Sequence, residues 1–477
     1  MQHTELASSP PAAVARPAVA YRWTPLVVML SGTFMVVLDF FIVNVALPAM
    51  QQELQASAGA LQWVVAGYGL ATAAGLITGG RLGDLFGRRR MFMLGLALFT
   101  LASAACAAAP DDATLIAARV AQGLAGALLQ PQVLAMIGLV YTGEARAKAF
   151  AAYGLTLGLG ATLGQLVGGS LIQADVAGLG WRTCFLINVP IGLLALAGAR
   201  WIPPLANSGR SRLDIAGAGL AALASIAVVL PLVEGREQGW PLWSWLCLAA
   251  AAPLLAAFAA QQRRLAGRGG EPLVAPALLA HRSFVLGLCT TLAFYVGNAS
   301  FYFVLALYLQ QGRALSPLAS GVVFTALALG FFATSMAAPW LARRFDGAPI
   351  ARGAMLLALG HALQFANVTG WGSDHVVAWM IPLLLLQGAG LGMVMAPLVS
   401  TVLAGLPPQH AGVASGVLAT VQQAGNALGV ALIGIVYYGQ LQAGAVASGQ
   451  ALGLSLLYLW VSALSVALLH RLSQRSA

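Results

Sequence analysis

Long apolar runs follow one another along almost the whole chain, and they constrain its fold more than any other feature. Hydrophobic residues make up 60% of the 477 residues and charged residues only 8%, and the mean hydropathy is +0.84. A soluble domain is about 25% charged, whereas about 20 apolar residues suffice for one helical crossing of a bilayer. The sequence therefore predicts an all-α, polytopic membrane protein. Its fourteen predicted spans are residues 24–48, 60–80, 91–109, 113–140, 149–173, 184–202, 213–233, 242–260, 283–310, 316–341, 349–370, 375–402, 412–438 and 449–470.

The positive charges lie where an even number of spans and a cytoplasmic N-terminus would place them. Twenty of the 24 lysines and arginines fall in predicted cytoplasmic segments, while Arg182, Arg236 and Arg313 fall on the other side and Arg119 within a span. This bias is the positive-inside pattern, so we expect an inner-membrane protein with both termini in the cytoplasm. The bases lie singly or in small groups between apolar runs, so the net charge of +10 does not indicate nucleic-acid binding.

The longest predicted cytoplasmic link in the interior follows the eighth span and divides the chain. A degenerate echo of residues 80–90 recurs at residues 340–347, which favours two related halves such as an alternating-access carrier requires. Residues 1–22 contain no apolar core and are expected to be a tail, not a signal peptide. The predicted domains are 1–23, a disordered cytoplasmic tail; 24–202, an N-terminal six-helix bundle; 203–282, two extra central helices and a cytoplasmic link; 283–470, a C-terminal six-helix bundle; and 471–477, a cytoplasmic tail.

The connection between the second and third spans carries more chemistry than linkage needs. Residues 80–90 read GRLGDLFGRRR. Gly80, Gly83 and Gly87 permit a tight turn with positive φ, and arginines such as Arg88 hold the segment in the cytoplasm. Asp84 has no topological role, because acids contribute little to orientation. We therefore expect these five residues to have a function beyond linkage.

Two residues of fixed charge type lie well inside predicted spans: Asp39 in the first and Arg119 in the fourth. Each costs a few kcal/mol at mid-membrane, so such residues usually face a partner or a wet cavity. Desolvation favours the neutral form of Asp39, whereas a nearby arginine favours the carboxylate. This opposition suits proton coupling, which we predict for the pair. The alternative is a static buried ion pair that fixes helix register.

Neutral polar residues within the spans are candidates for lining a substrate cavity. Gln122 shares a helical face with Arg119. Tyr295, Asn298 and Tyr302 form a stripe that could accept flat amphipathic molecules or could serve interhelical hydrogen bonding. His361 could relay protons or simply pack. The predicted cavity residues are Asn44, Gln122, Gln165, Tyr295, Asn298, Tyr302, His361, Gln387, Gln422 and Asn426.

No motif in the sequence supports an enzyme. The four cysteines lie in or beside apolar runs without a CxxC spacing, so neither a metal site nor a disulfide is expected. A phosphate-binding P-loop, GxSxG and HExxH are all missing from the sequence. We therefore expect no cofactor, with the proton gradient as the source of energy.

These motifs together resemble the major facilitator superfamily. Residues 80–90 resemble the signature between its second and third spans, and Arg119, Gln122 and Gly123 are similar to its fourth-span motif. Residues 38–48, LDFFIVNVALP, resemble the first-span motif of its fourteen-span drug:proton antiporter branch, the EmrB/QacA-like multidrug exporters. Residues 181–192, WRTCFLINVPIG, resemble the start of that branch's sixth span. The resemblance covers residues 24–470 and implies the major facilitator fold, with two six-helix bundles plus two extra central helices.

The resemblance also implies that five residues of the connection between the second and third spans form a conformational gate, namely Gly80, Gly83, Asp84, Gly87 and Arg88. In this superfamily the acid locks one arrangement by interacting across the bundles with a helix N-terminus, here near Gly412. An acid at a helix N-terminus gains typically about 0.3–1 kcal/mol, enough to bias a conformational equilibrium. Two positions depart from the branch pattern. Gln165 stands where the fifth-span motif has proline, and Phe41 stands where the first-span motif has a hydroxyl residue.

Together these features predict a proton-coupled membrane transporter that exports small amphipathic compounds or drugs by alternating access. Its expected partners are the lipid bilayer, a small-molecule substrate and protons, with a periplasmic adaptor protein as a candidate. One alternative is uptake or facilitated diffusion of a metabolite without proton coupling. Another, of a different class, is a transport-inactive membrane sensor or assembly subunit.

Overall fold

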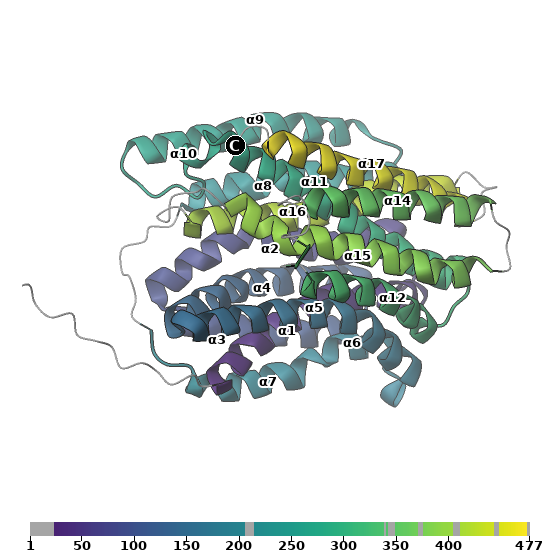
Figure 1. Ribbon diagram of the computed structural model, residues 1–477, viewed down its shortest axis with the longest axis horizontal. Helices are drawn as coiled ribbons and strands as arrows, with labels where there is room; N and C mark the ends of the chain where they lie inside the picture. The colour runs from purple at the N-terminus through teal and green to yellow at the C-terminus, as the bar shows by residue number, and fades with distance from the viewer. Residues whose placement is uncertain are drawn as a thin grey trace, which may run out of the picture.

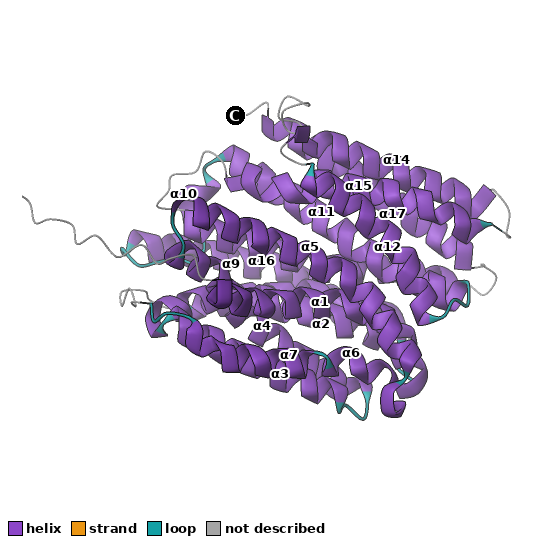
Figure 2. Ribbon diagram, turned by 60° about the horizontal axis from the view of Figure 1, so that its bottom comes forward, coloured by secondary structure: helices purple, strands orange, loops and turns teal. Residues whose placement is uncertain are grey.

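The computed structural model describes residues 23–205, 214–337, 340–341, 349–370, 375–403, 411–442 and 448–474. Helices joined by short loops make up these ranges, and no β-strand occurs within them (Figure 2). The predicted N-terminal tail and the end of the C-terminal tail lie outside these ranges. The first seven helices are α1 Trp23–Leu54, α2 Ala58–Phe86, α3 Arg88–Ala107, α4 Asp112–Val140, α5 Gly143–Ala174, α6 Thr183–Leu186 and α7 Asn188–Gly198. The central helices are α8 Ile215–Glu237, α9 Leu242–Gly267 and the short α10 Pro276–Leu279. The last helices are α11 Arg282–Leu307, α12 Pro317–Met336, α14 Pro349–Gly370, α15 Val376–Leu403, α16 Ala411–Gln442 and α17 Ser448–Gln474.

The helices agree with the prediction of an all-α polytopic membrane protein. Within the described ranges, 13 segments are long and apolar enough to cross a membrane. One of them, Gly180–Trp201, combines α6, α7 and the flanking turns. The remaining predicted span corresponds to α14, a 22-residue helix made less apolar by Arg352, His361 and Asn367. The fold class is therefore confirmed.

The helices lie roughly parallel in two groups (Figure 1). In the first group, α4 packs on α2 and α3, and α5 packs on α1. In the second, α15 packs on α12 and α14, while α11 packs on α16 and α17. The groups meet where α2 contacts α16 and where α5 contacts α12. The central helix α8 contacts α9, α2 and α16, so it touches both groups.

Burial varies with the position of each helix in this arrangement. Most residues of α1 between Leu38 and Pro48 are buried, as are those of α11 from Asn298 to Leu307 except Tyr302. The buried residues of α9 are only Ser244, Ala251 and Gln262. Its apolar surface needs no protein cover, because lipid is the solvent there. This explains why the sequence is apolar on every face of most spans.

The connection between α2 and α3 differs from the predicted loop. The helix α2 continues through Phe86, and Gly87 alone separates it from α3. Gly87 has a φ of 98°, a backbone conformation that residues with a Cβ rarely adopt. The chain stays helical beyond residue 80 because α2 still packs on α4 there, with Gly79 and Gly83 against its backbone and side chains. The tight turn is confirmed, but it occupies one residue.

Charged side chains gather at the two ends of the bundle. At the end formed by the α1–α2 turn, Arg182 pairs with Glu53, and Arg236 lies 3.6 Å from Glu237. Glu237 also accepts a hydrogen bond of 2.6 Å from the Gly59 N–H, joining α8 to the start of α2. The bases predicted for the cytoplasmic side include those near the end of α2. One of them, Arg81, pairs with Glu271. Of the predicted echo at residues 340–347, residues 342–347 lie outside the described residues.

Close backbone contact between α12 and α15 gives a test of this packing. A Cβ on Gly388 would overlap the carbonyl of Leu327. We expect Gly388→Ala to push the two helices apart and to lower the free energy of unfolding by about 1–3 kcal/mol. Thermal unfolding of the purified protein in detergent measures this. Gly154→Ala is the matched control, because its Cβ would meet nothing within 4 Å. Equal midpoints for the two variants would contradict the packing.

Candidate functional site

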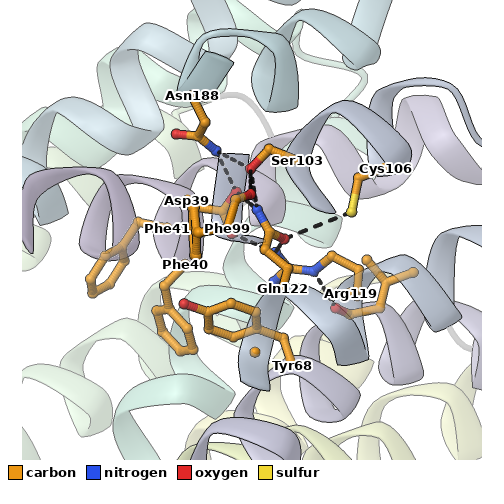
Figure 3. A network of polar contacts seen from close by, with 12 residues as sticks. Asp39, Phe40, Phe41, Tyr68, Phe99, Ser103, Cys106, Arg119, Gln122 and Asn188 are labelled. Carbon is orange, nitrogen blue, oxygen red and sulfur yellow. Dashed lines mark hydrogen bonds and ion pairs between the residues drawn. The ribbon is translucent and has the colours of Figure 1, made fainter. Parts of the chain in front are cut away.

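The two predicted intramembrane charges form a buried ion pair between α1 and α4 (Figure 3). Arg119 Nη1 lies 2.5 Å from Asp39 Oδ2, and both side chains are fully buried. Arg119 also donates through Nε to the Val64 carbonyl of α2 at 2.9 Å. Removing two ions from water costs several kcal/mol each unless pairing and hydrogen bonds offset the loss. The geometry supplies the carboxylate with an ion-pair partner and with hydrogen bonds. It supplies the guanidinium with an ion-pair partner and with most of the hydrogen bonds that it can donate.

Two amides complete the surroundings of the carboxylate. Gln122 Nε2 and Asn188 Nδ2 each donate to Asp39 Oδ1 at 2.8 Å. Gln122 Oε1 accepts from Arg119 Nη1 at 2.6 Å, so the pair and this amide form a closed ring. Ser103 Oγ on α3 accepts from Gln122 at 2.8 Å and from Asn188 at 3.3 Å. Four segments, α1, α3, α4 and α7, therefore converge on one carboxylate.

Local sequence explains how two of these side chains reach the site. Arg119 and Gln122 are three residues apart on α4, which puts them on one face. Asn188 opens α7, directly after the break between α6 and α7 at Ile187. Pro190 has no N–H to donate to the carbonyl of Leu186, so the helix cannot run through this point undisturbed. Ile187 itself keeps helical φ and ψ angles of −59° and −28°, and Asn188 is fully buried.

Aromatic rings enclose the ion pair. The Arg119 guanidinium carbon lies 4.2 Å from the centre of the Tyr68 ring and 5.7 Å from that of Phe185. A cation over an aromatic face gains about 0.5–2 kcal/mol, the more so when it is desolvated. Tyr68, Phe185 and Phe99 are almost completely buried. The ion pair therefore lies in a low-dielectric setting, where charge interactions are strong.

An aromatic cluster connects the two helix groups near this site. The ring of Phe41 on α1 packs edge-on against Tyr302 on α11, with centroids 4.8 Å apart. Tyr302 in turn stacks on Phe324 of α12 at 5.8 Å. Gln165 Nε2 on α5 donates to the Phe41 carbonyl at 2.9 Å. The two departures from the branch pattern, Phe41 and Gln165, thus lie in direct contact.

The remaining predicted cavity residues do not form a single cluster. His361 packs on Phe301 and lies 3.4 Å from Gln387 Nε2. Asn426 Nδ2 donates to Gln423, and Asn44 donates to carbonyls of its own helix, Phe40 and Phe41.

Three further predicted cavity residues have different degrees of burial. Tyr295 and Asn298 are buried, and Gln422 is half-buried. A groove of about 330 Å³ between α11, α16 and α17 is lined by other residues, among them Leu292, Val296 and Leu432. That cavity residues converge on one substrate site stays a prediction.

The predicted gate residues have distinct structural roles. Asp84 accepts a hydrogen bond from Arg88, one turn further along. A Cβ on Gly83 would overlap the side chain of Gln132 on α4, which itself donates to the Gly79 carbonyl at 2.8 Å. A Cβ on Gly80 would lie 3.6 Å from its nearest neighbour, Pro131, which is an ordinary van der Waals contact. The predicted contact of Asp84 with the helix near Gly412 borders residues outside the described ranges and stays a prediction.

Sequence reasoning missed several members of the site. Asn188 lies in the sixth-span motif but was not assigned to the site. Ser103, Tyr68 and Gln132 carry no motif at all. One signal was available: each is a polar or amphipathic residue in an apolar span. Many such residues form a hydrogen bond with the backbone of their own helix, as Thr100 does by donating to the Leu96 carbonyl. The signal therefore does not distinguish the site residues from the others.

A family model confirms what the site suggests. The model for the Major Facilitator Superfamily matches residues 29–430. The chain belongs to the major facilitator superfamily. Proteins of this superfamily are transporters, so the predictions of a multi-pass membrane transporter and of a protein that is not an enzyme are confirmed.

Two of the relatives to which this chain is similar come from Streptomyces species. The chain is 38% identical over 438 residues to a probable actinorhodin transporter of Streptomyces coelicolor. The alignment covers 91% of this chain and 75% of that relative. It is 39% identical over 429 residues to the puromycin resistance protein pur8 of Streptomyces alboniger. That alignment covers 88% of this chain and 82% of the relative. These major facilitator relatives agree with the predicted drug:proton antiporter branch.

A solved structure supports the fold independently of close sequence similarity. A structure from work on proton-dependent oligopeptide transporters has a TM-score of 0.68 and 16% identity, over 95% of this chain and 99% of that chain. In the described part of this major facilitator chain, no group of three or more His, Cys, Asp or Glu side chains could hold a metal ion.

A double-mutant cycle tests the ion pair. Asp39→Asn leaves Arg119 as an uncompensated buried cation, and Arg119→Gln leaves Asp39 as an uncompensated anion. We expect each to lower the free energy of unfolding by about 3–5 kcal/mol. The double variant should cost less than the sum by about 0.5–3 kcal/mol. Unfolding in detergent measures all four proteins, and strictly additive effects would show that the pair is not coupled.

Proposed function

We propose that this major facilitator protein exports small amphipathic compounds, antibiotics among them, in exchange for protons by alternating access. The carrying observation is the fully buried Asp39–Arg119 pair with its carboxylate surrounded by hydrogen-bond donors. A carboxylate that is isolated from water can hold a proton on one side of a membrane and release it when its surroundings change. Proton uptake and release would then accompany the change in conformation that alternating access involves.

Two further observations support export of drug-like compounds. The relatives are named as an antibiotic transporter and an antibiotic resistance protein. The Phe41–Tyr302–Phe324 cluster places aromatic faces where α1 meets α11 and α12. Aromatic faces suit flat, partly apolar molecules. Substrate contacts of the predicted cavity residues, such as Tyr295 and Gln387, belong to this proposal.

The same proposal covers energy source, topology and gate. The proton gradient drives transport without a cofactor, and both termini lie in the cytoplasm, as the distribution of arginines indicates. Asp84, with Gly80, Gly83, Gly87 and Arg88, biases the equilibrium between inward-open and inward-closed arrangements. A periplasmic adaptor protein is a candidate partner.

An uncoupled carrier is the competing function, and one observation favours it. Both oxygens of Asp39 are already hydrogen-bonded, as expected for a static pair that fixes helix register. In that case the pair would stabilise the bundle, and transport would not depend on the pH gradient.

Proton exchange in everted membrane vesicles distinguishes the two. A growth-inhibition panel of antibiotics, puromycin included, first identifies a transported probe. Adding that probe to vesicles with an acidic interior should release protons from the wild type, as seen with a pH-sensitive dye. Asp39→Asn should abolish this release, whereas Asp39→Glu, which keeps a carboxylate, should retain part of it.

Asp111→Asn is the matched control for loss of one acid. Asp111 caps α4 by accepting a hydrogen bond from the Thr114 N–H at 2.7 Å, and this bond lowers the pKa of its fully exposed carboxyl. Asparagine caps helices equally well, so proton release should match the wild type at equal amounts of protein. Unchanged release in Asp39→Asn would overturn the proton-carrying role and favour the uncoupled carrier.

Cysteine labelling tests the gate. A Cβ on Gly416 of α16 would lie 3.6 Å from Ile77 on α2, close to the end that carries Asp84. In a background with Cys247 and Cys289 changed to serine, Gly416→Cys reports how far α2 and α16 separate. Adding Asp84→Asn should raise the labelling rate by about two- to fivefold, corresponding to the 0.3–1 kcal/mol of a helix-terminus charge. An unchanged rate would remove Asp84 from the gate.

A further inference from the structure

The Asp39 carboxylate accepts hydrogen bonds on both of its oxygens. Oδ2 faces Arg119 Nη1 at 2.5 Å. Oδ1 faces the N–H groups of Gln122 and Asn188, each at 2.8 Å. A carboxylate oxygen has two acceptor positions, and these two donors occupy both positions of Oδ1. A proton on Oδ1 therefore requires one of the two amides to present an acceptor in place of a donor.

The two amides differ in their freedom to do so. Gln122 Oε1 already accepts from Arg119 Nη1 at 2.6 Å and from Cys106 Sγ at 3.7 Å. Rotating this amide would leave the arginine donor without its acceptor. Asn188 Oδ1 is buried, and it has no hydrogen-bond partner among the described residues. Rotating the Asn188 amide therefore costs no hydrogen bond at that oxygen and gives it one.

Other ionisable groups also lie around Asp39. Those that interact electrostatically with it are Arg119 on α4, Tyr68 on α2, Cys106 on α3 and Cys184 on α6. From α5 and α11, the polar groups near the neighbouring Phe41 are Gln165 and Tyr302. The arginine can only donate. Within the part of the chain that the structure describes, the Asp39 carboxylate accepts hydrogen bonds from Arg119, Gln122 and Asn188.

We propose that Asn188 is the positioning residue that exchanges donor for acceptor when Asp39 changes protonation state. This inference rests on the proposed proton-carrying role of Asp39. With Asp39 ionised, Asn188 Nδ2 donates to Oδ1. When a proton binds to Oδ1, the Asn188 amide rotates about its Cβ–Cγ bond, and Asn188 Oδ1 accepts that proton's hydrogen bond.

The surroundings of Asn188 support both states. Ser103 Oγ now accepts from Asn188 at 3.3 Å, while its own proton is donated to the Phe99 carbonyl at 2.8 Å. After rotation, the serine hydroxyl can donate to the asparagine oxygen, because a hydroxyl is both donor and acceptor. Gln122 keeps its bond to Ser103 and its acceptor role toward Arg119 throughout. The exchange thus ends the two hydrogen bonds that Asn188 Nδ2 donates and turns the Ser103 hydroxyl away from Phe99. It leaves the ring of Arg119 and Gln122 intact.

Infrared difference spectroscopy of the purified protein between high and low pH tests this directly. The carbonyl stretch of protonated Asp39 is assigned as the band that Asp39→Asn removes. In Asn188→Leu, the carboxyl proton loses its acceptor, so we expect the band to move to higher frequency. The pH midpoint should rise by less than about one unit, because the ionised form loses a donor and the neutral form loses an acceptor.

The other outcomes overturn the assignment. If Asn188 were a fixed donor, the midpoint would rise by about one to two units with the band unmoved. A spectrum identical to that of the wild type would also exclude the exchange. Asn188→Ser, which keeps a donor and an acceptor, should hold the band near its wild-type position. Asn188→Ala carries the same test as the leucine variant if that variant fails to fold.

Asn367→Leu is the matched control. Asn367 is a buried asparagine of α14 that donates one hydrogen bond, to the Val376 carbonyl at 3.1 Å, and its Oδ1 likewise has no partner among the described residues. Its variant should leave the Asp39 band in place, and an equal shift there would refute a specific role for Asn188. If no band depends on Asp39 at any pH, the proposed proton-carrying function fails instead.

Discussion

The ion pair between Asp39 and Arg119 is the interaction on which the N-terminal helix group depends. Two opposite charges with no exposure to water are tolerated only if donors and acceptors surround them on all sides. That requirement draws α3 and α7 to the pair through Ser103 and Asn188. It also draws in α2, whose Val64 carbonyl accepts from Arg119. The packing of these helices therefore serves a polar centre as much as an apolar core.

Glycine supplies the complementary constraint, because it lets helices approach until their backbones touch. Gly164 and Gly168 on α5 meet Phe41 and Ile42 on α1, and Gly169 meets Pro317 of α12. One helix thus lies tightly against both helix groups. In a bilayer, where lipid is as apolar as a side chain, such close packing and hydrogen bonding hold helices together. Gln165, placed among these glycines, adds a hydrogen bond to that contact.

Much of the fold was predictable because membrane spans are written into local composition. Run length predicted nearly every helix, and α14, which contains Arg352 and His361, was found by the same reading. The connection around Gly87 was predicted as a loop, although α2 stays helical up to it. Composition marks where a chain leaves the apolar layer. It does not show whether a neighbour such as α4 keeps the helix packed beyond that point.

The candidate site was predictable in part. Asp39 and Arg119 were conspicuous because ionised groups are costly in a membrane, and Gln122 followed from its helical spacing. The predicted cavity residues were chosen by the same criterion of polarity, yet His361 and Gln387 pair with each other and Asn44 bonds its own helix. A polar side chain in a span can satisfy its own backbone, another helix or a ligand. Only the arrangement of helices distinguishes these cases.

By itself, the sequence determined the class of the molecule, the number and direction of its spans as predictions, and the two charges that need a partner. These follow from local quantities, namely the apolar length of each run and the free energy of burying a charge. Tertiary structure alone decided which groups surround Asp39. Asn188 lies 149 positions away in the chain from the carboxylate to which it donates. Hydrogen bonds of that kind depend on how distant helices pack, and no local pattern encodes that packing.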